Sequence, residues 1–149
     1  MAGTLADRLG ERALIVGGLL SEAIGMAWLA PLAEPGRAYA PTIAPMIVAG
    51  AGFAMAIPVV QKSVMGAVAP ADIGKASGVL STIRQLGGAF GIAIGVAVFA
   101  AAGSYSSAQA FTDGCGPAIG ACAALALAGA VAGMALPAGP PSARLGPGP

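Results

Sequence analysis

The chain contains no histidine and only two cysteines. Zinc sites and histidine-activated nucleophiles therefore lack the residues that form them. Cys115 and Cys122 lie in one apolar block, about 10 Å apart along a helix axis, so we expect two separate thiols that behave as small apolar side chains. Since the sequence shows no nucleophile paired with a base, metal cluster or phosphate loop, we expect neither an enzyme nor a bound cofactor.

Charge is scarce as well. Charged residues make up 9% of the chain and hydrophobic residues 57%, with a mean hydropathy of +0.85, whereas soluble domains carry roughly 25% charged residues. So few charges do not cover a water-facing surface, and we expect the lipid bilayer to be the outer solvent. The net charge of +1, with basic residues scattered along the chain, argues against a nucleic-acid partner.

Long apolar blocks are what the sequence does contain. A helix of about 20 residues crosses the hydrocarbon core and satisfies its own backbone groups. We therefore predict an all-α integral membrane protein with four transmembrane helices, at 13–32, 42–60, 76–102 and 117–136. Residues 1–12 form a charged loop before them. The tail at 137–149 is rich in proline and glycine, and we expect it to be disordered.

Basic residues near the span ends predict the orientation, since they concentrate on the cytoplasmic side. An even number of spans places most of them on one side and Arg37 alone on the other. We therefore expect both termini to face the cytoplasm, with the protein in the plasma membrane. The residues on the cytoplasmic side are Arg8, Arg12, Lys62, Lys75 and Arg144.

Small residues indicate where helices meet, because helices in lipid approach one another closely through glycine, alanine and serine. Gly87, Gly91 and Gly95 recur at every fourth position of the third block, and we expect them to be packing contacts. The same spacing occurs at Gly17, Ser21 and Gly25 and at Gly116, Gly120 and Ala124. Pro58, inside the second block, is expected to be either a hinge or a static kink.

Charged residues inside the spans are candidate functional groups, since a charge at the bilayer centre costs roughly 2.5 to 3.5 kcal/mol. Glu22 shares a helix face with Gly18 and Gly25, so we expect it to point toward the bundle. It is either a proton-exchanging carboxyl group or a passive hydrogen-bonding group. Arg84 and Gln85 either line the cytoplasmic half of a pathway, or the long Arg84 side chain extends to the lipid headgroups.

Two motifs together indicate a family. The run Gly3-x-Leu5-Ala6-Asp7-Arg8-x-Gly10-x-Arg12 resembles the cytoplasmic loop motif of the major facilitator superfamily. The run from Gly74 to Ala93, which includes Arg84-Gln85-Leu86-Gly87-Gly88, resembles the penultimate helix of the fourteen-span drug:proton antiporter branch of that superfamily. The resemblance covers Gly3 to Leu136 and corresponds to the last four helices of a longer pattern.

The resemblance implies part of a proton-coupled exporter of small amphipathic molecules, inactive without the missing N-terminal helices. Asp7, Arg8 and Arg12 would form a cytoplasmic latch, meaning a charged contact made in one state and released in the other. Glu11 departs from the basic residue common at its position. The resemblance does not itself nominate Glu22 as the proton site.

Two other functions remain open on the residues alone. The first is a self-sufficient four-helix exporter that acts as a dimer, in which Glu22 exchanges protons for cationic drugs. The second is a membrane partner protein that transports nothing and docks against another helical protein through its small-residue faces.

Overall fold

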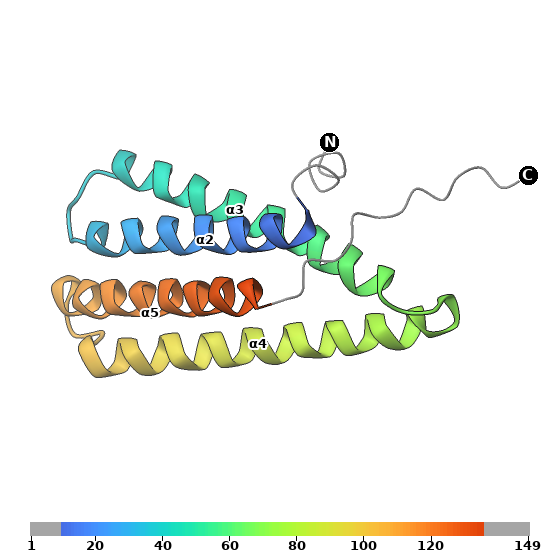
Figure 1. The fold of residues 1–149 in the computed structure, drawn as a ribbon. Helices are drawn as coiled ribbons and strands as arrows, with labels where there is room; N and C mark the ends of the chain where they lie inside the picture. Colours follow the sequence, from blue (N-terminus) through green and yellow to red (C-terminus); the bar gives the residue numbers. More distant parts are fainter. Residues whose placement is uncertain (1–9, 136–149) are drawn as a thin grey trace, which may run out of the picture.

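The computed structural model describes residues 10–135, which fold into long helices joined by short turns (Figure 1). No strand occurs within this range. Each long helix has the length and hydropathy to cross a membrane, which confirms the predicted fold class for the described residues. The helices are α2 (Glu11–Leu29), α3 (Ala40–Gly66), α4 (Ile73–Ala102) and α5 (Ala108–Met134), with 3-10 turns at Ala30–Leu32 and Pro70–Asp72.

The helices extend beyond the apolar blocks, most clearly in α5, which begins at Ala108 rather than at Pro117. Ser107 is the N-cap, and its Oγ accepts a hydrogen bond from the backbone N–H of Ala110 at 3.1 Å. Gln109, Thr112 and Asp113 lie in its first turns, and Thr112 Oγ1 donates to the carbonyl oxygen of Ala108 at 3.1 Å. Hydropathy misses these turns because polar residues interrupt them, whereas the N-cap at Ser107 decides where the helix starts.

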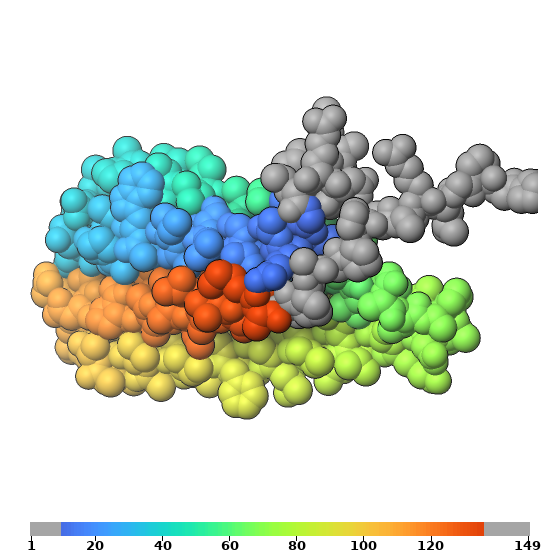
Figure 2. All heavy atoms as spheres, viewed as in Figure 1, coloured from blue at the N-terminus to red at the C-terminus, as the bar shows by residue number. Residues whose placement is uncertain are grey.

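The helices are arranged in the order α3, α2, α5, α4 across the bundle (Figure 1). α2 packs against both α3 and α5, and α5 packs against α4, so α4 lies at one edge. In the space-filling view the atoms of α5 separate those of α2 from those of α4 (Figure 2). The best-packed apolar cluster lies between α2 and α3, where Leu14, Ile15 and Val59 are buried.

Close contact between α2 and α3 depends on glycines that face each other. A Cβ atom at Gly18 would lie 2.8 Å from the carbonyl oxygen of Gly52, and one at Gly52 would lie 2.6 Å from the backbone nitrogen of Glu22. Neither distance leaves room for a methyl group. The two backbones therefore touch directly, and dispersion between them replaces the apolar burial that lipid makes ineffective.

The same interface continues one to two turns further along α2. A Cβ atom at Gly25 would lie 2.7 Å from the carbonyl oxygen of Pro45. Between these glycine contacts, Ser21 Oγ donates a hydrogen bond to the carbonyl oxygen of Val48 at 3.0 Å. Gly17, which shares the predicted spacing, has no atom near its Cβ position. The contact face of α2 is therefore the one that carries Gly18, Ser21 and Gly25.

A second close contact joins α4 to α5 at the turn between them. A Cβ atom at Gly103 would lie 2.7 Å from the backbone nitrogen of Gly114. Beside these glycines, the ring of Phe99 lies 5.2 Å from that of Tyr105 and 5.3 Å from that of Phe111, measured between centroids. Such tilted and edge-on pairs add stability beyond the area that they bury. This turn therefore fixes α4 to α5 at one end.

The α2–α3 interface predicts the effect of one added methyl group. We expect Gly52→Ala to push the two helices apart and to lower the free energy of unfolding by about 1–3 kcal/mol, the usual cost of overpacking. Gly50→Ala, on the same helix with open space at its Cβ position, is the matched control, and should be neutral or stabilising by up to about 1 kcal/mol. Thermal unfolding in detergent micelles measures both, and equal midpoints for the two variants would contradict the interface.

Candidate functional site

The up-and-down order of the helices brings the start of α2, the end of α3 and the start of α4 to one side of the bundle (Figure 1). Arg12, Lys62 and Lys75 belong to these segments, whereas Arg37 lies in the turn on the opposite side. The described basic residues outside the spans are thus divided between the sides as the sequence predicted. The cytoplasmic location of the first side stays a prediction.

Glu11, at the start of α2, contacts two polar residues near the end of α3. Ser63 Oγ donates a hydrogen bond to one carboxylate oxygen of Glu11, and Lys62 Nζ lies 3.6 Å from the other. The side chains of Lys62 and Glu11 are 50% and 38% exposed, so water partly screens this ion pair. Glu11 also lies in the first turn of α2, where the helix dipole favours a negative charge.

Arg12, the next residue, connects α2 to α5. Its Nη2 donates a hydrogen bond to the backbone carbonyl oxygen of Met134, the last residue of α5. A cation at a helix C-terminus is stabilised by the carbonyl groups that lack intrahelical partners. We call Glu11, Arg12, Lys62 and Ser63 the Glu11 cluster. It joins α2, α3 and α5 through charged contacts on one side of the bundle.

The predicted latch falls only partly on this cluster. Asp7 and Arg8 lie outside the described residues, while Arg12 is described and bound to α5. Sequence reasoning missed the pairing of Glu11 with Lys62 and Ser63, since it treated Glu11 as a departure from the family pattern. The available signal was the polar run after Val60, which continues α3 beyond the predicted span end.

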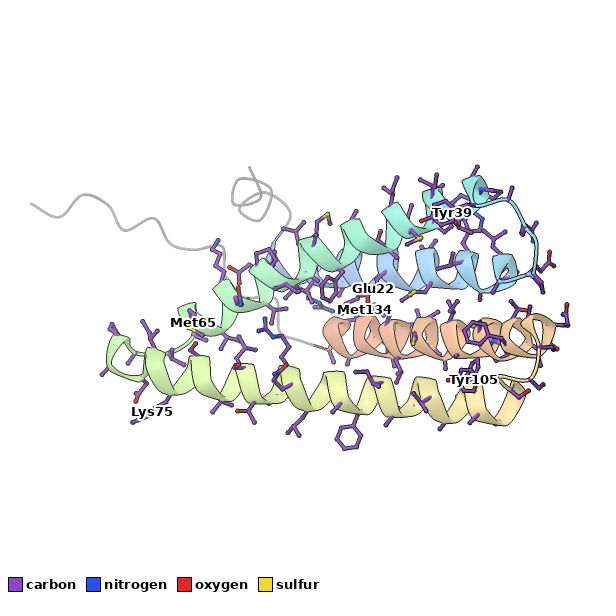
Figure 3. All side chains as sticks on the ribbon, turned by 180° about the vertical axis from the view of Figure 1, so that it is seen from behind. Glu22, Tyr39, Met65, Lys75, Tyr105 and Met134 are labelled. Carbon is purple, nitrogen blue, oxygen red and sulfur yellow. The ribbon has the colours of Figure 1, made fainter. Side chains whose placement is uncertain are left out.

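Glu22 lies near the middle of α2 and is half-buried (Figure 3). Its backbone is close to Gly52 of α3, and Gly18 and Gly25, on the same face, are buried against that helix. Among residues 10–135 its carboxyl group has no hydrogen bond or ion pair. The structure therefore places within a span a carboxyl group that no described residue binds.

Arg84 and Gln85 are exposed on α4, and neither has a hydrogen bond or ion pair within the described residues. α5 lies between α4 and α2 (Figure 1), so Arg84 and Glu22 form no ion pair with each other. The structure thus does not gather the predicted pathway residues into one site. Their role in a pathway stays a prediction.

The residues predicted for packing and hinge motion have an unexpected environment. No atom lies within 4 Å of the Cβ position at Gly87, Gly91 or Gly95, so these glycines make no close contact within the described helices. The observed contacts use Gly18, Gly25, Gly52 and their partners instead. Pro58 is exposed within the continuous helix α3, and nothing in the structure tests whether it acts as a hinge.

An apolar groove lies between the end of α3 and the first half of α4, with a volume of about 370 Å³. Asp72 and Lys75, which pair at 3.0 Å, contribute its charged lining. Within the described part of the chain no group of three His, Cys, Asp or Glu residues is placed to hold a metal ion. The other lining residues are Val64, Val68, Ala76, Val79, Leu80 and Ile83.

Comparison with known proteins finds similarity to two proteins that are named for antibiotic export and resistance. It is 35% identical over 99 residues to the cephamycin export protein CmcT of Amycolatopsis lactamdurans, which covers 66% of this chain and 20% of that protein. It is 36% identical over 97 residues to the puromycin resistance protein pur8 of Streptomyces alboniger, covering 63% of this chain and 19% of that protein. No family model matches the chain, and no solved structure matches it significantly.

The fold and these relatives together define a class. Four helices able to span a membrane and similarity to export and resistance proteins indicate a multi-pass membrane protein. The chain spans about a fifth of the length of the curated relatives that it matches.

The Glu11 cluster predicts a modest, salt-dependent effect on stability. We expect Glu11→Ala to lower the free energy of unfolding by about 0.5–1 kcal/mol, because Ser63 and Lys62 lose their shared acceptor while remaining partly hydrated. Thermal unfolding in detergent at low and high salt measures this difference. The control is Glu34→Ala, which removes an exposed pair with Arg37 inside a single turn. Equal effects of the two substitutions would show that the cluster does not join helices.

Proposed function

We propose that this chain forms the last four helices of a proton-coupled drug exporter of the major facilitator type. The observation that carries the proposal is the homology to a cephamycin export protein and a puromycin resistance protein. The loop motif at residues 3–12 and the motif of α4 supply the assignment to the superfamily and to its antiporter branch. The chain matches about a fifth of each relative, which supports a function that this chain performs together with further helices.

Glu22 is the proposed proton site. Its carboxyl group lies within a span, is half-buried, and has no partner in the described residues. Proton binding would discharge it, so the protonated and ionised forms would favour different arrangements of the surrounding helices. This difference is what couples a proton to a conformational change in a transporter that alternates its access.

The Glu11 cluster and the loop before it form the proposed latch. Contacts of Glu11 and Arg12 with α3 and α5 bias the helix ends toward one arrangement. Such charge-assisted bonds are partly exposed, so they break and re-form at small free-energy cost. Asp7 and Arg8 are proposed to act with Arg12 at this side of the membrane. The substrate class is small amphipathic molecules.

The proposal predicts that the chain alone does not transport. In proteoliposomes with an imposed proton gradient, dye efflux should equal that of empty vesicles, because most of the proposed helices are absent. In cells that also produce the cephamycin export protein without its matched segment, the chain should restore export. Glu22→Gln should then reduce this export at least about tenfold, as expected for the loss of a group required by the coupled step.

Two results would contradict the proposal. Proton-driven efflux by the chain alone, abolished by Glu22→Gln and accompanied by crosslinked homodimers, would establish the self-sufficient small exporter instead. A stable complex with another membrane protein, with no export under any condition, would favour a partner protein that transports nothing.

A further inference from the structure

Three exposed aromatic residues lie at the end of the bundle that carries the α2–α3 and α4–α5 turns, which we call the aromatic end. Trp28 is one residue before the end of α2, Tyr39 is the N-cap of α3, and Tyr105 lies in the turn between α4 and α5. They are 51%, 68% and 84% exposed, so at least half of each side chain faces the surroundings. Figure 3 shows Tyr39 and Tyr105 at this end, on different sides of the bundle and far from Lys75.

The distribution of these residue types along the bundle is one-sided. The chain has one tryptophan and two tyrosines, so the aromatic end holds all of them. At the opposite end, where α2 begins and α3 is followed by α4, the sequence instead places Arg12, Lys62 and Lys75. Tryptophan and tyrosine combine an apolar ring with one polar group, which suits the boundary between hydrocarbon and lipid headgroups.

Polar contacts accompany the aromatic residues in the turns and in the first turns of α5. In the α2–α3 turn, Arg37 Nη1 donates a hydrogen bond to a carboxylate oxygen of Glu34 at 2.9 Å. In the first turns of α5, Gln109 Nε2 donates to Asp113 Oδ1 at 3.0 Å. Ion pairs and amide groups of this kind are exposed here, so this level of the bundle suits a hydrated environment.

One turn or more further into the spans, the exposed side chains become aliphatic. Ile24 precedes Trp28 by one turn of α2, and Ile43 follows Tyr39 by one turn of α3. On α4, Val96 is likewise exposed. The surface thus changes from polar turns through aromatic residues to aliphatic residues, which is the order of water, headgroups and hydrocarbon across a bilayer.

Helix length sets the depth of the other groups once Trp28 marks the headgroup boundary. Glu22 lies six residues from Trp28, or about 9 Å along the axis of α2, and is therefore inside the hydrocarbon. Glu11 lies 17 residues from Trp28, which is about 26 Å, whereas the hydrocarbon core is roughly 30 Å thick. The Glu11 cluster thus reaches the second boundary only when the bilayer is slightly thin or its long side chains extend.

We propose that lipid headgroups hold the aromatic end at a fixed depth through Trp28, Tyr39 and Tyr105, while the end with the Glu11 cluster absorbs changes in bilayer thickness. The rigid rings define one depth, whereas long lysine and arginine side chains reach the headgroups from a range of depths. The proposal goes beyond the proposed function, since it requires insertion in a bilayer but neither drug export nor proton coupling.

Quenching of tryptophan fluorescence measures the first part of the proposal. The full chain, with Trp28 as its single tryptophan, is reconstituted in phosphatidylcholine vesicles whose acyl chains carry bromine either near the headgroup or near the terminal methyl group. We expect the shallow bromine to quench Trp28 at least about twofold more strongly than the deep bromine, because a ring at the headgroup boundary lies closer to it.

A matched variant calibrates this depth. Trp28→Phe with Ile24→Trp moves the single tryptophan to an exposed position about 6 Å deeper on the same helix. Quenching by the deep bromine should increase relative to quenching by the shallow bromine. A variant with the same ratio as the natural chain would show that the measurement does not resolve depth along α2, and the proposed depth of Trp28 would then fall with it.

The second part is measured by comparing bilayers with short and long acyl chains. In the natural chain, quenching of Trp28 by the shallow bromine should be equal in both. In a variant with Tyr39→Leu and Tyr105→Phe, it should fall about twofold in the thick bilayer, because a shorter bundle without these anchors moves inward. Phenylalanine at position 105 keeps a ring beside Phe99 and loses only the hydroxyl group.

A control variant removes aromatic rings from the middle of the spans. Phe53→Leu with Phe90→Leu replaces two exposed rings near the centres of α3 and α4. This variant should behave as the natural chain does in both bilayers, since neither ring lies at a headgroup boundary.

Three results would overturn the proposal. Stronger quenching by the deep bromine would place the aromatic end in hydrocarbon. Weak quenching by both lipids, together with crosslinked homodimers, would make a second copy the partner of this end. An equal response of the natural chain and the tyrosine variant to thickness would remove the anchoring role of the tyrosines. None of these measurements uses transport, so the anchor and the proposed function can fail separately.

Discussion

The structure depends on how helices pack against one another in lipid, because lipid is as apolar as their side chains. Burying leucine or valine between two helices gains little when lipid already surrounds them, so the strong contacts are those that bring backbones together. α2 and α3 illustrate this: Gly18 faces Gly52, and Ser21 bonds to a backbone carbonyl oxygen. These contacts provide dispersion and one polar bond in place of apolar burial.

The same constraint explains the uneven packing of the bundle. α2 lies in the interior because two of its sides carry residues that another helix contacts closely, whereas α4 packs mainly against α5, with a close backbone contact at Gly103. Water becomes available at the helix ends, and at one end of the bundle charged contacts join the helices. The Glu11 cluster joins the helices on one side by this second means.

Charges left within the spans connect the structure to function. Glu22 and Arg84 lie on helices that α5 separates, and within the described residues neither has a partner. A charged group within a span costs free energy unless it has a partner or water. Each of these residues therefore indicates either a functional role or a contact with another helix. Homology to antibiotic export and resistance proteins, of which the chain spans about a fifth, is consistent with both.

The sequence by itself determined that the chain is all helical, that its helices are long enough to span a membrane, and how the described basic residues outside the spans divide between its sides. These properties follow from local composition, because hydropathy and backbone satisfaction act within each segment. Only the tertiary structure decided which glycines make contacts. Gly18 and Gly52 touch another helix while Gly17 and Gly50 face open space, since the difference depends on how each helix is rotated toward its neighbour. The pairing of Glu11 with Lys62 and Ser63 was likewise decided there, because it joins residues far apart in the chain that meet only when α2 and α3 pack.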